Sequence, residues 1–240
     1  MPETIALSRI FERPITEKAF VEESFSELGD LGFKADNAIA CVSLCRDEIA
    51  APLAAHVRDA WGEAFNLSAL AGMFFVGKTG LAAALHHAPQ VDGRHRTIFY
   101  ALPHVAVGTG GQVGLCCRKG LRTSRACGAL CIFLDELKGG TRNLSVDRDD
   151  LEMGLLRVRL LQEIPDGRVP DLLELTRIAQ RIIVADLERA IEAVVERGTG
   201  DHAIVTGIQI HAPDGNYVEP LPSYAVVGGS RRPLKLGHPG

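Results

Sequence analysis

The chain has 240 residues, of which 46% are hydrophobic and 23% charged, so it is long enough and apolar enough to bury one substantial core. A formal net charge of −4 argues against a nucleic-acid or acidic-membrane surface, and 5% aromatic residues leave few side chains for base stacking. The sequence has neither a basic-then-apolar leader nor an apolar run of roughly 18 residues that would cross a bilayer. We therefore expect a cytoplasmic protein with no membrane or nucleic-acid partner. A single domain is expected over residues 1–240, with a helical N-terminal segment over about 1–35.

The first hundred residues alternate between helical and strand-like patterns. Residues 16–28 have the periodicity of a helix, and the apolar run 38–44 is typical of a buried strand that ends at Cys45. A second helix is expected to run to about Trp61. The apolar segment 72–76 then leads into an alanine-rich helix.

The centre of the chain holds the clearest strand pattern, residues 97–107, which carries His104 near its end. Residues 112–117 are expected to pair back on this strand after a glycine-rich turn, and the basic segment 118–125 is expected to form a loop. Cys127 then stands at the start of an apolar helix.

The last third predicts two helices, at about 149–163 and 170–197, of which the second is strongly amphipathic. A strand at 203–211 and a short strand around 224–227 follow. Because strands alternate with helices along the chain, we predict an α/β fold with a mostly parallel sheet and helices on both faces.

Three of these positions have the side chains of a catalytic zinc site. Ligands of open α/β sheets lie at the carboxyl ends of strands, where Cys45 and His104 are placed. Cys127 lies at a helix N-terminus, which favours a thiolate. Two cysteines and one histidine are a recognised ligand set that leaves the fourth zinc position open. The spacing includes no C-x-x-C pair, so by spacing alone a set of buried cysteines and a core histidine is the favoured interpretation.

A carboxylate beside the candidate metal strengthens the metal interpretation. Asp47 follows Cys45 by two residues, and a carboxylate there can accept a proton from a metal-activated water in a hydrogen bond. Arg46 is the neighbouring cation that could keep Asp47 ionised. We predict Asp47 and Arg46 as catalytic residues; the alternative is an ordinary charged first turn of a helix.

A second motif indicates different chemistry. The segment from Gly72 to Thr79 fits the phosphate-loop pattern G-x-x-x-x-G-K-[ST], and the pair Asp135 and Glu136 resembles the acidic residues that hold magnesium in nucleotide hydrolases. The four variable positions, however, are Met-Phe-Phe-Val, which favour burial over a loop around an anion. The residues before Gly72 are also a poor strand. A nucleotide hydrolase is therefore the less favoured alternative.

Several short blocks, taken in order, resemble the low-CO2-inducible protein B/C family, a divergent group of beta-type carbonic anhydrases also called the theta class. The resemblance covers most of the chain. The blocks are CRDE at 45–48, GKTG at 77–80 with HHAP at 86–89, PHVA at 103–106, QVG at 112–114, ACGAL at 126–130, and IQI at 208–210 followed by SYAVV at 223–227.

The resemblance implies a beta-carbonic-anhydrase-like fold with Zn²⁺ on Cys45, His104 and Cys127 and with Asp47 next to the metal. It implies reversible hydration of CO2 to bicarbonate and a proton, in a homodimer with its sites near the subunit interface. It also implies that the GKTG segment at 77–80 is part of the scaffold rather than a phosphate loop. A catalytically inactive, zinc-bound homologue that binds a partner is a further alternative, because fold alone does not determine turnover.

The chain departs from the family of ordinary beta-type enzymes at one position. Those enzymes carry C-x-D-x-R, and here Ile49 stands where the arginine would be. The arginine that pairs with Asp47 would then be Arg46 or one from the basic segment, namely Arg118, Arg122 or Arg125.

Overall fold

The computed structural model describes residues 7–91, 93–195 and 200–237. Its main feature is a ten-stranded sheet whose principal strand order is β1-β10-β9-β5-β2-β3. The centre is parallel, because β2 pairs with β3 and β5, and β5 and β6 both pair with β9. These strands are β2 (Ile39–Ser43), β3 (Ala64–Asn66), β5 (Arg94–Ala101), β6 (His104–Ala106) and β9 (Gly200–Ala212).

Antiparallel strands extend this parallel centre. The strands β10 and β11 pair with different parts of β9, β1 pairs with β10, β12 with β11, and β4 with β5. A separate two-stranded hairpin stands beside the sheet. The antiparallel strands are β1 (Ile15–Thr16), β4 (Gln90–Val91), β10 (Gly215–Pro220), β11 (Ser223–Val227) and β12 (Ser230–Leu234); the hairpin consists of β7 (Leu115–Arg118) and β8 (Leu121–Arg125).

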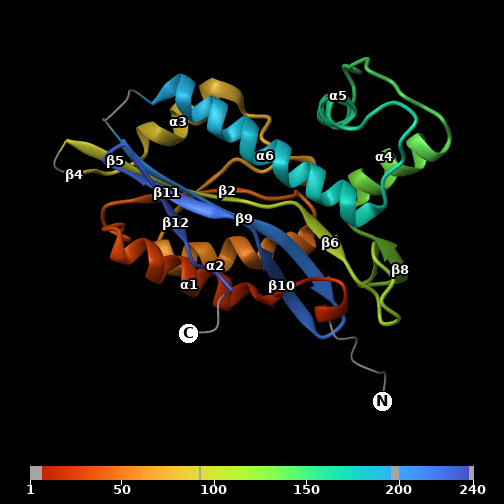
Figure 1. Cartoon of the computed structure of the whole chain (residues 1–240), viewed down its shortest axis with the longest axis horizontal. Coiled ribbons are helices and arrows are strands. Elements are labelled where there is room, and N and C mark those ends of the chain that lie inside the picture. Colours follow the sequence, from red (N-terminus) through yellow and green to blue (C-terminus); the bar gives the residue numbers. More distant parts are fainter. Residues whose placement is uncertain (1–6, 92, 196–199, 238–240) are drawn as a thin grey trace.

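Helices cover both faces of the sheet (Figure 1). In Figure 1, α1 and α2 lie below the sheet, and α3 and α6 lie above it. None of the helices in the described part of the chain is long and apolar enough to cross a bilayer. The helices are α1 (Glu17–Asp30), α2 (Ala51–Trp61), α3 (Gly77–His86), α4 (Gly128–Lys138), α5 (Leu151–Glu163) and α6 (Leu172–Val194), with short 3-10 helices η1 (Leu7–Arg9), η2 (Glu48–Ala50) and η3 (Leu70–Gly72).

The side chains of the central strands alternate between two apolar layers. Cys41 and Phe99 pack into the layer that contains α3, α4, α5 and α6, whereas Val42 and Tyr100 pack into the layer between the sheet and helices α1 and α2. This alternation is the expected result of the two-residue period of a strand. Both faces of β2 and β5 are therefore buried, and the carboxyl ends of these strands are held rigidly by packing on two sides.

The prediction of an α/β fold with helices on both faces of a largely parallel sheet is confirmed for the sheet centre. Two details differ. The strand expected over 97–107 is interrupted at Pro103, which has no N–H to donate to a ladder. The expected loop 118–125 contains strand β8, and residues 115–118 pair with it rather than with β6. A single bridge, between Val107 and Val113, remains of the expected pairing.

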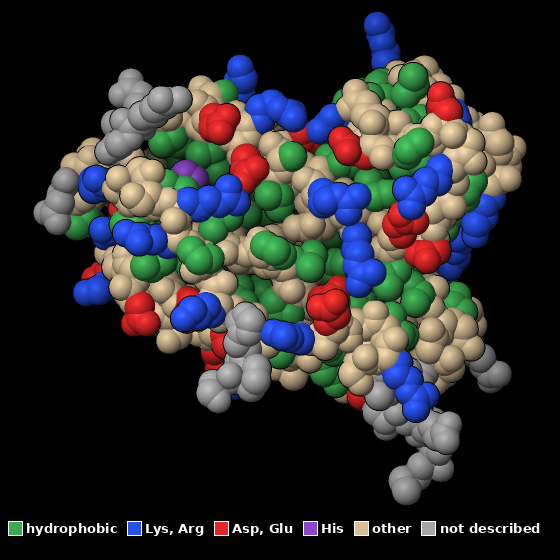
Figure 2. All heavy atoms as spheres, in the orientation of Figure 1, with side chains coloured by type: hydrophobic (Ala, Val, Ile, Leu, Met, Phe, Trp, Pro, Cys, Tyr) green, Lys and Arg blue, Asp and Glu red, His purple; other side chains and the backbone are tan. Residues whose placement is uncertain are grey.

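The visible face of the molecule carries both signs of charge. Figure 2 shows lysine and arginine side chains interspersed with aspartate and glutamate, with apolar patches between them. Because neither sign dominates this face, it has no broad basic surface of the kind that holds a nucleic-acid backbone.

Candidate metal centre

Three ligand-bearing side chains meet where the parallel strands end. Cys45 follows β2 and forms an isolated bridge with Ala69, His104 is the first residue of β6, and Cys127 is the N-cap of α4. Their ligand atoms all lie within 4.8 Å of one another. The three residues are 8%, 0% and 1% exposed, respectively. The structure thus brings together the three residues that the sequence singled out.

The geometry of this cluster suits zinc. A tetrahedral ion with Zn–S bonds of about 2.3 Å separates its two sulfur ligands by about 3.8 Å. Here the Sγ atoms of Cys45 and Cys127 are 3.8 Å apart. The Nε2 atom of His104 is buried and has no hydrogen-bond partner within the described residues, which a buried polar atom rarely tolerates. An ion bound between these three atoms would satisfy it.

The two thiols are electrostatically coupled. A hydrogen bond from the Cys127 thiol lowers the pKa of Cys45, and His104 lowers it further. Burial acts in the opposite direction but is outweighed. The same hydrogen bond and burial raise the pKa of Cys127, although backbone N–H groups at the start of α4 act in the other direction. The Cys45 thiol is therefore the more readily ionised of the two. A divalent cation needs both residues as thiolates, so its binding would release the protons that the two thiols hold.

Asp47 lies beside the cluster and is held by an arginine. Its Oδ2 atom is 3.9 Å from Nε2 of His104. Arg118 donates to both carboxylate oxygens, at 2.7 and 2.6 Å, and also to Glu48. Burial alone would raise the pKa of Asp47. The hydrogen bonds from Arg118, together with smaller contributions from His104 and neighbouring groups, outweigh burial and lower the pKa to about 2. Asp47 is therefore ionised at neutral pH.

Of the arginines that the sequence offers as partners of Asp47, the structure places Arg118 beside it and Arg46 elsewhere. Arg46 donates instead to Glu152 of α5, at 2.6 and 3.3 Å, and its side chain is 60% exposed. Neighbouring side chains of an extended segment point to opposite sides, so Arg46 faces away while Cys45 and Asp47 face the cluster. Among the other candidates, Arg125 pairs with Asp135 in α4, and the side chain of Arg122 lies outside the described residues.

A second histidine, which the sequence did not single out, adjoins the cluster. Nε2 of His211 is 3.1 Å from Nδ1 of His104, and its Nδ1 is 3.0 Å from Oδ1 of Asn216. Burial, together with the nearby His104, lowers the pKa of His211 to about 4, so this ring is neutral at physiological pH. The one available signal was its position at the end of a predicted strand, where ligands of α/β sheets gather.

The phosphate-loop pattern lacks its structural context. No strand leads into Gly72, which ends a 3-10 helix, and Met73 is fully buried. Gly72 has φ +77°, and a Cβ atom there would lie 2.5 Å from the carbonyl oxygen of Leu102. This close approach to the backbone explains the first glycine of the pattern. Asp135 lies in helix α4. The magnesium-binding carboxylate of a phosphate-loop protein would instead lie at the end of a strand.

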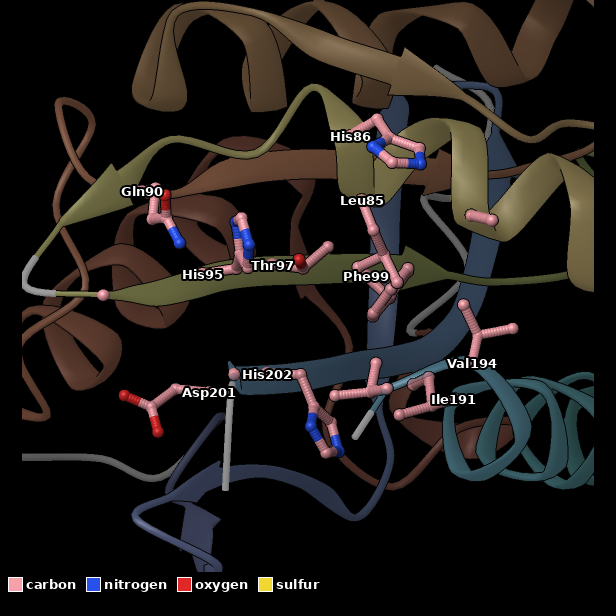
Figure 3. A pocket seen from close by; sticks show the side chains of 14 residues that line it. Leu85, His86, Gln90, His95, Thr97, Phe99, Ile191, Val194, Asp201 and His202 are labelled. Carbon is pink, nitrogen blue, oxygen red and sulfur yellow. The ribbon is translucent and has the colours of Figure 1, made fainter. Parts of the chain in front are cut away.

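A separate cavity of about 510 Å³ lies at the opposite ends of β5 and β9 (Figure 3). It is lined by His86, His95 and His202 above an apolar floor that includes Phe99. Figure 3 shows the rings of His95 and His202 pointing in different directions, so they do not converge on one ion. Within the described residues, the group able to hold a metal is the one formed by the two cysteines and His104.

Comparisons with known proteins agree with this geometry. A family model described as limiting CO2-inducible proteins B/C beta carbonic anhydrases matches residues 14–227. The crystal structure of limiting CO2-inducible protein LCIB is similar, with a TM-score of 0.80 and 31% identity over 95% of this chain and 97% of that chain. PtLCIB4, a homologue of LCIB, shares the fold with a TM-score of 0.79 and 22% identity over 95% of this chain and 98% of its own. No curated protein matches the chain. The family match over nearly the whole chain means that this protein belongs to the family of limiting CO2-inducible proteins B and C, which is described as a group of beta carbonic anhydrases.

Proposed function

We propose that the protein is a zinc enzyme that catalyses the reversible hydration of CO2 to bicarbonate and a proton, with zinc held by Cys45, His104 and Cys127. The observation that carries this proposal is the buried Cys2His cluster with an ionised carboxylate, Asp47, beside it. Zinc bound there would lower the pKa of a water to about 7, which supplies hydroxide at neutral pH.

The protein's own residues hold the reacting groups in place. Asp47 lies where it would accept a hydrogen bond from a water at the metal position and so orient that water toward the carbon of CO2. Arg118 keeps Asp47 ionised and, through two parallel hydrogen bonds, fixes the plane of its carboxylate. Phe74 packs in the same apolar cluster as Cys45 and Cys127, which supports an apolar environment for CO2 next to the metal position.

We also propose, from the family resemblance, that the chain forms a homodimer. The region from α4 to α5 carries exposed apolar side chains, including Ile132, Leu144 and Leu151, each more than half exposed. Such residues suit an interface between two copies of the chain. Light scattering at several protein concentrations gives the mass in solution; a monomer at all concentrations would contradict this proposal.

Metal analysis and a hydration assay test the proposed activity together. After desalting, the protein should retain one zinc per chain and hydrate CO2 in a stopped-flow indicator assay. Cys127→Ala removes a ligand and should lose both zinc and activity. Cys131→Ala is the matched control, because Cys131 is a buried thiol one turn further along α4 and outside the cluster.

Each outcome of this experiment has a distinct meaning. Zinc and activity that both disappear in Cys127→Ala but not in Cys131→Ala support the proposal. Stoichiometric zinc without hydration would identify the inactive, partner-binding alternative. Absence of zinc from a folded protein that is supplied with zinc during expression would contradict the metal site itself.

A further inference from the structure

A buried carboxylate begins a chain of hydrogen bonds that leads to the metal cluster. Glu17, in the first turn of α1, is only 2% exposed. It accepts a hydrogen bond of 2.6 Å from the side-chain amide of Gln209, and the side-chain amide of Asn216 lies close enough to lower its pKa. A buried carboxylate without such donors would be strongly destabilising, so its two amide partners are held in a defined orientation.

The orientation of Asn216 suits both neighbours. Its oxygen Oδ1 lies 3.0 Å from Nδ1 of His211, and an amide turned this way can direct its nitrogen toward the Glu17 carboxylate. The β9–β10 hairpin places the two residues opposite each other, because Asn216 and His211 are register partners across the two antiparallel strands. An oxygen at this position can only accept, so Nδ1 of His211 must carry a proton.

This proton assignment determines the next one. With its proton on Nδ1, His211 presents the lone pair of Nε2 to Nδ1 of His104, 3.1 Å away, and accepts a hydrogen bond from it. Nδ1 of His104 then carries a proton, and its Nε2 directs a lone pair toward the sulfurs of Cys45 and Cys127. That is the form of histidine that binds a metal through Nε2.

We propose that His211 and Asn216, anchored by Glu17, are positioning residues of the metal centre: they fix His104 in the tautomer and ring orientation in which Nε2 binds the ion. The inference rests on the proposed zinc site and adds the residues that orient its histidine. Metal-binding histidines usually donate their second ring N–H to a carboxylate, a carbonyl or water, and loss of such a partner typically costs about 10- to 100-fold in metal affinity.

Zinc affinity, measured by competition with a chromogenic chelator, tests the proposal without an activity assay. His211→Leu removes the acceptor for His104 and should weaken zinc binding by about 10- to 100-fold. His211→Gln restores an acceptor oxygen and should recover most of the affinity. His202→Leu is the matched control, because His202 lies on the same strand, lines the separate cavity and should leave the affinity unchanged.

Nuclear magnetic resonance gives a second readout that does not depend on zinc. Long-range ¹H–¹⁵N spectra of the reduced, metal-free protein should show a proton on Nδ1 of His104 that exchanges slowly with water, and Asn216→Ala should accelerate this exchange. This measurement keeps the inference testable if His211→Leu does not fold. It also tests the inference if the chain binds no zinc. Absence of zinc would contradict the proposed function but would leave the proposed tautomer of His104 open to this measurement.

Two results would overturn the inference. One is a His104 ring without a proton on Nδ1. The other is a folded His211→Leu protein that binds zinc as tightly as the wild type and the His202→Leu control, because His104 would then need no partner to present Nε2.

Discussion

Replacing Arg118 with methionine removes the guanidinium that holds Asp47 and leaves a neutral side chain of similar length. The contact is bidentate, and the side chains of Arg118 and Asp47 are only 14% and 12% exposed. Solvent therefore screens this pair less than an ordinary surface ion pair. The substitution should destabilise the folded protein and weaken the carboxylate that orients the reacting water.

The size of the effect follows from the pKa of Asp47. That pKa falls from an ordinary value of 3.8 to about 2 in the folded protein. At about 1.4 kcal/mol per pKa unit, the folded state gains roughly 2 to 3 kcal/mol from the ionised carboxylate, and Arg118 makes the largest favourable contribution to this gain. Because the folded pKa is the lower one, this contribution is fully present above pH 3.8 and is lost as the pH falls through 2. The loss in Arg118→Met should therefore be constant between pH 6 and 8.

A double-mutant cycle isolates this contribution from the other contacts of Arg118. We expect the coupling free energy between Arg118→Met and Asp47→Asn, from urea unfolding at pH 7, to be about 2 kcal/mol. The corresponding cycle on Arg46 and Glu152, which form a more exposed pair, should give about 1 kcal/mol or less. Equal coupling in the two cycles, or a larger value for Arg46, would refute the assignment of Arg118 as the partner of Asp47.

Three further outcomes are expected. Asp47→Ala should keep zinc but lose about 10- to 100-fold in CO2 hydration, since the carboxylate acts on the water rather than as a required ligand; full activity at normal zinc content would contradict its orienting role. Lys78→Ala should retain CO2 hydration, because Lys78 is exposed and no strand precedes its loop; ATP or GTP hydrolysis that disappears in this variant would favour the nucleotide hydrolase instead. Burial raises the pKa of Glu17 from 4.5 to about 7, so ionising this carboxyl destabilises the folded protein. As the pH rises from 5 to 8, the unfolding free energy of the wild type should therefore fall by up to roughly 3 kcal/mol relative to that of Glu17→Gln. Parallel pH profiles of urea unfolding for these two proteins would show that Glu17 does not titrate in this range.

The positions of the three candidate ligands could be predicted because each depends on a local pattern. Apolar runs mark the strands that end near Cys45 and His104, and the carboxyl ends of neighbouring parallel strands lie at one edge. Cys127 immediately precedes an apolar helical pattern, which α4 confirms. In these cases the short-range sequence determines the element, and the sheet topology brings the ends together.

The residues that support the ligands could not be predicted in this way. Arg118 reaches Asp47 across 71 residues from a hairpin whose glycine and basic residues are typical of a loop. His211 contacts His104 across 107 residues, and this contact depends on the register of β6 and β9, in which Ala106 is opposite His211. A register between distant strands is set by the packing of the whole sheet, and no single segment of sequence encodes it.

The wide separation of the ligands along the chain has a consequence for how the protein would acquire its ion. Cys45 and Cys127 are 82 residues apart, so in the unfolded chain the two thiols meet only after closure of a long loop. A C-x-x-C pair, by contrast, can bind zinc while the chain is still unfolded. Here an ion would bind the folded protein and not the unfolded chain. At a free ion concentration 1,000-fold above the dissociation constant, binding would raise the free energy of unfolding by about 4 kcal/mol. The apolar layers on both faces of the sheet extend far beyond Cys45 and Cys127, so scarcity of metal should yield a folded but less stable protein that can still be loaded later.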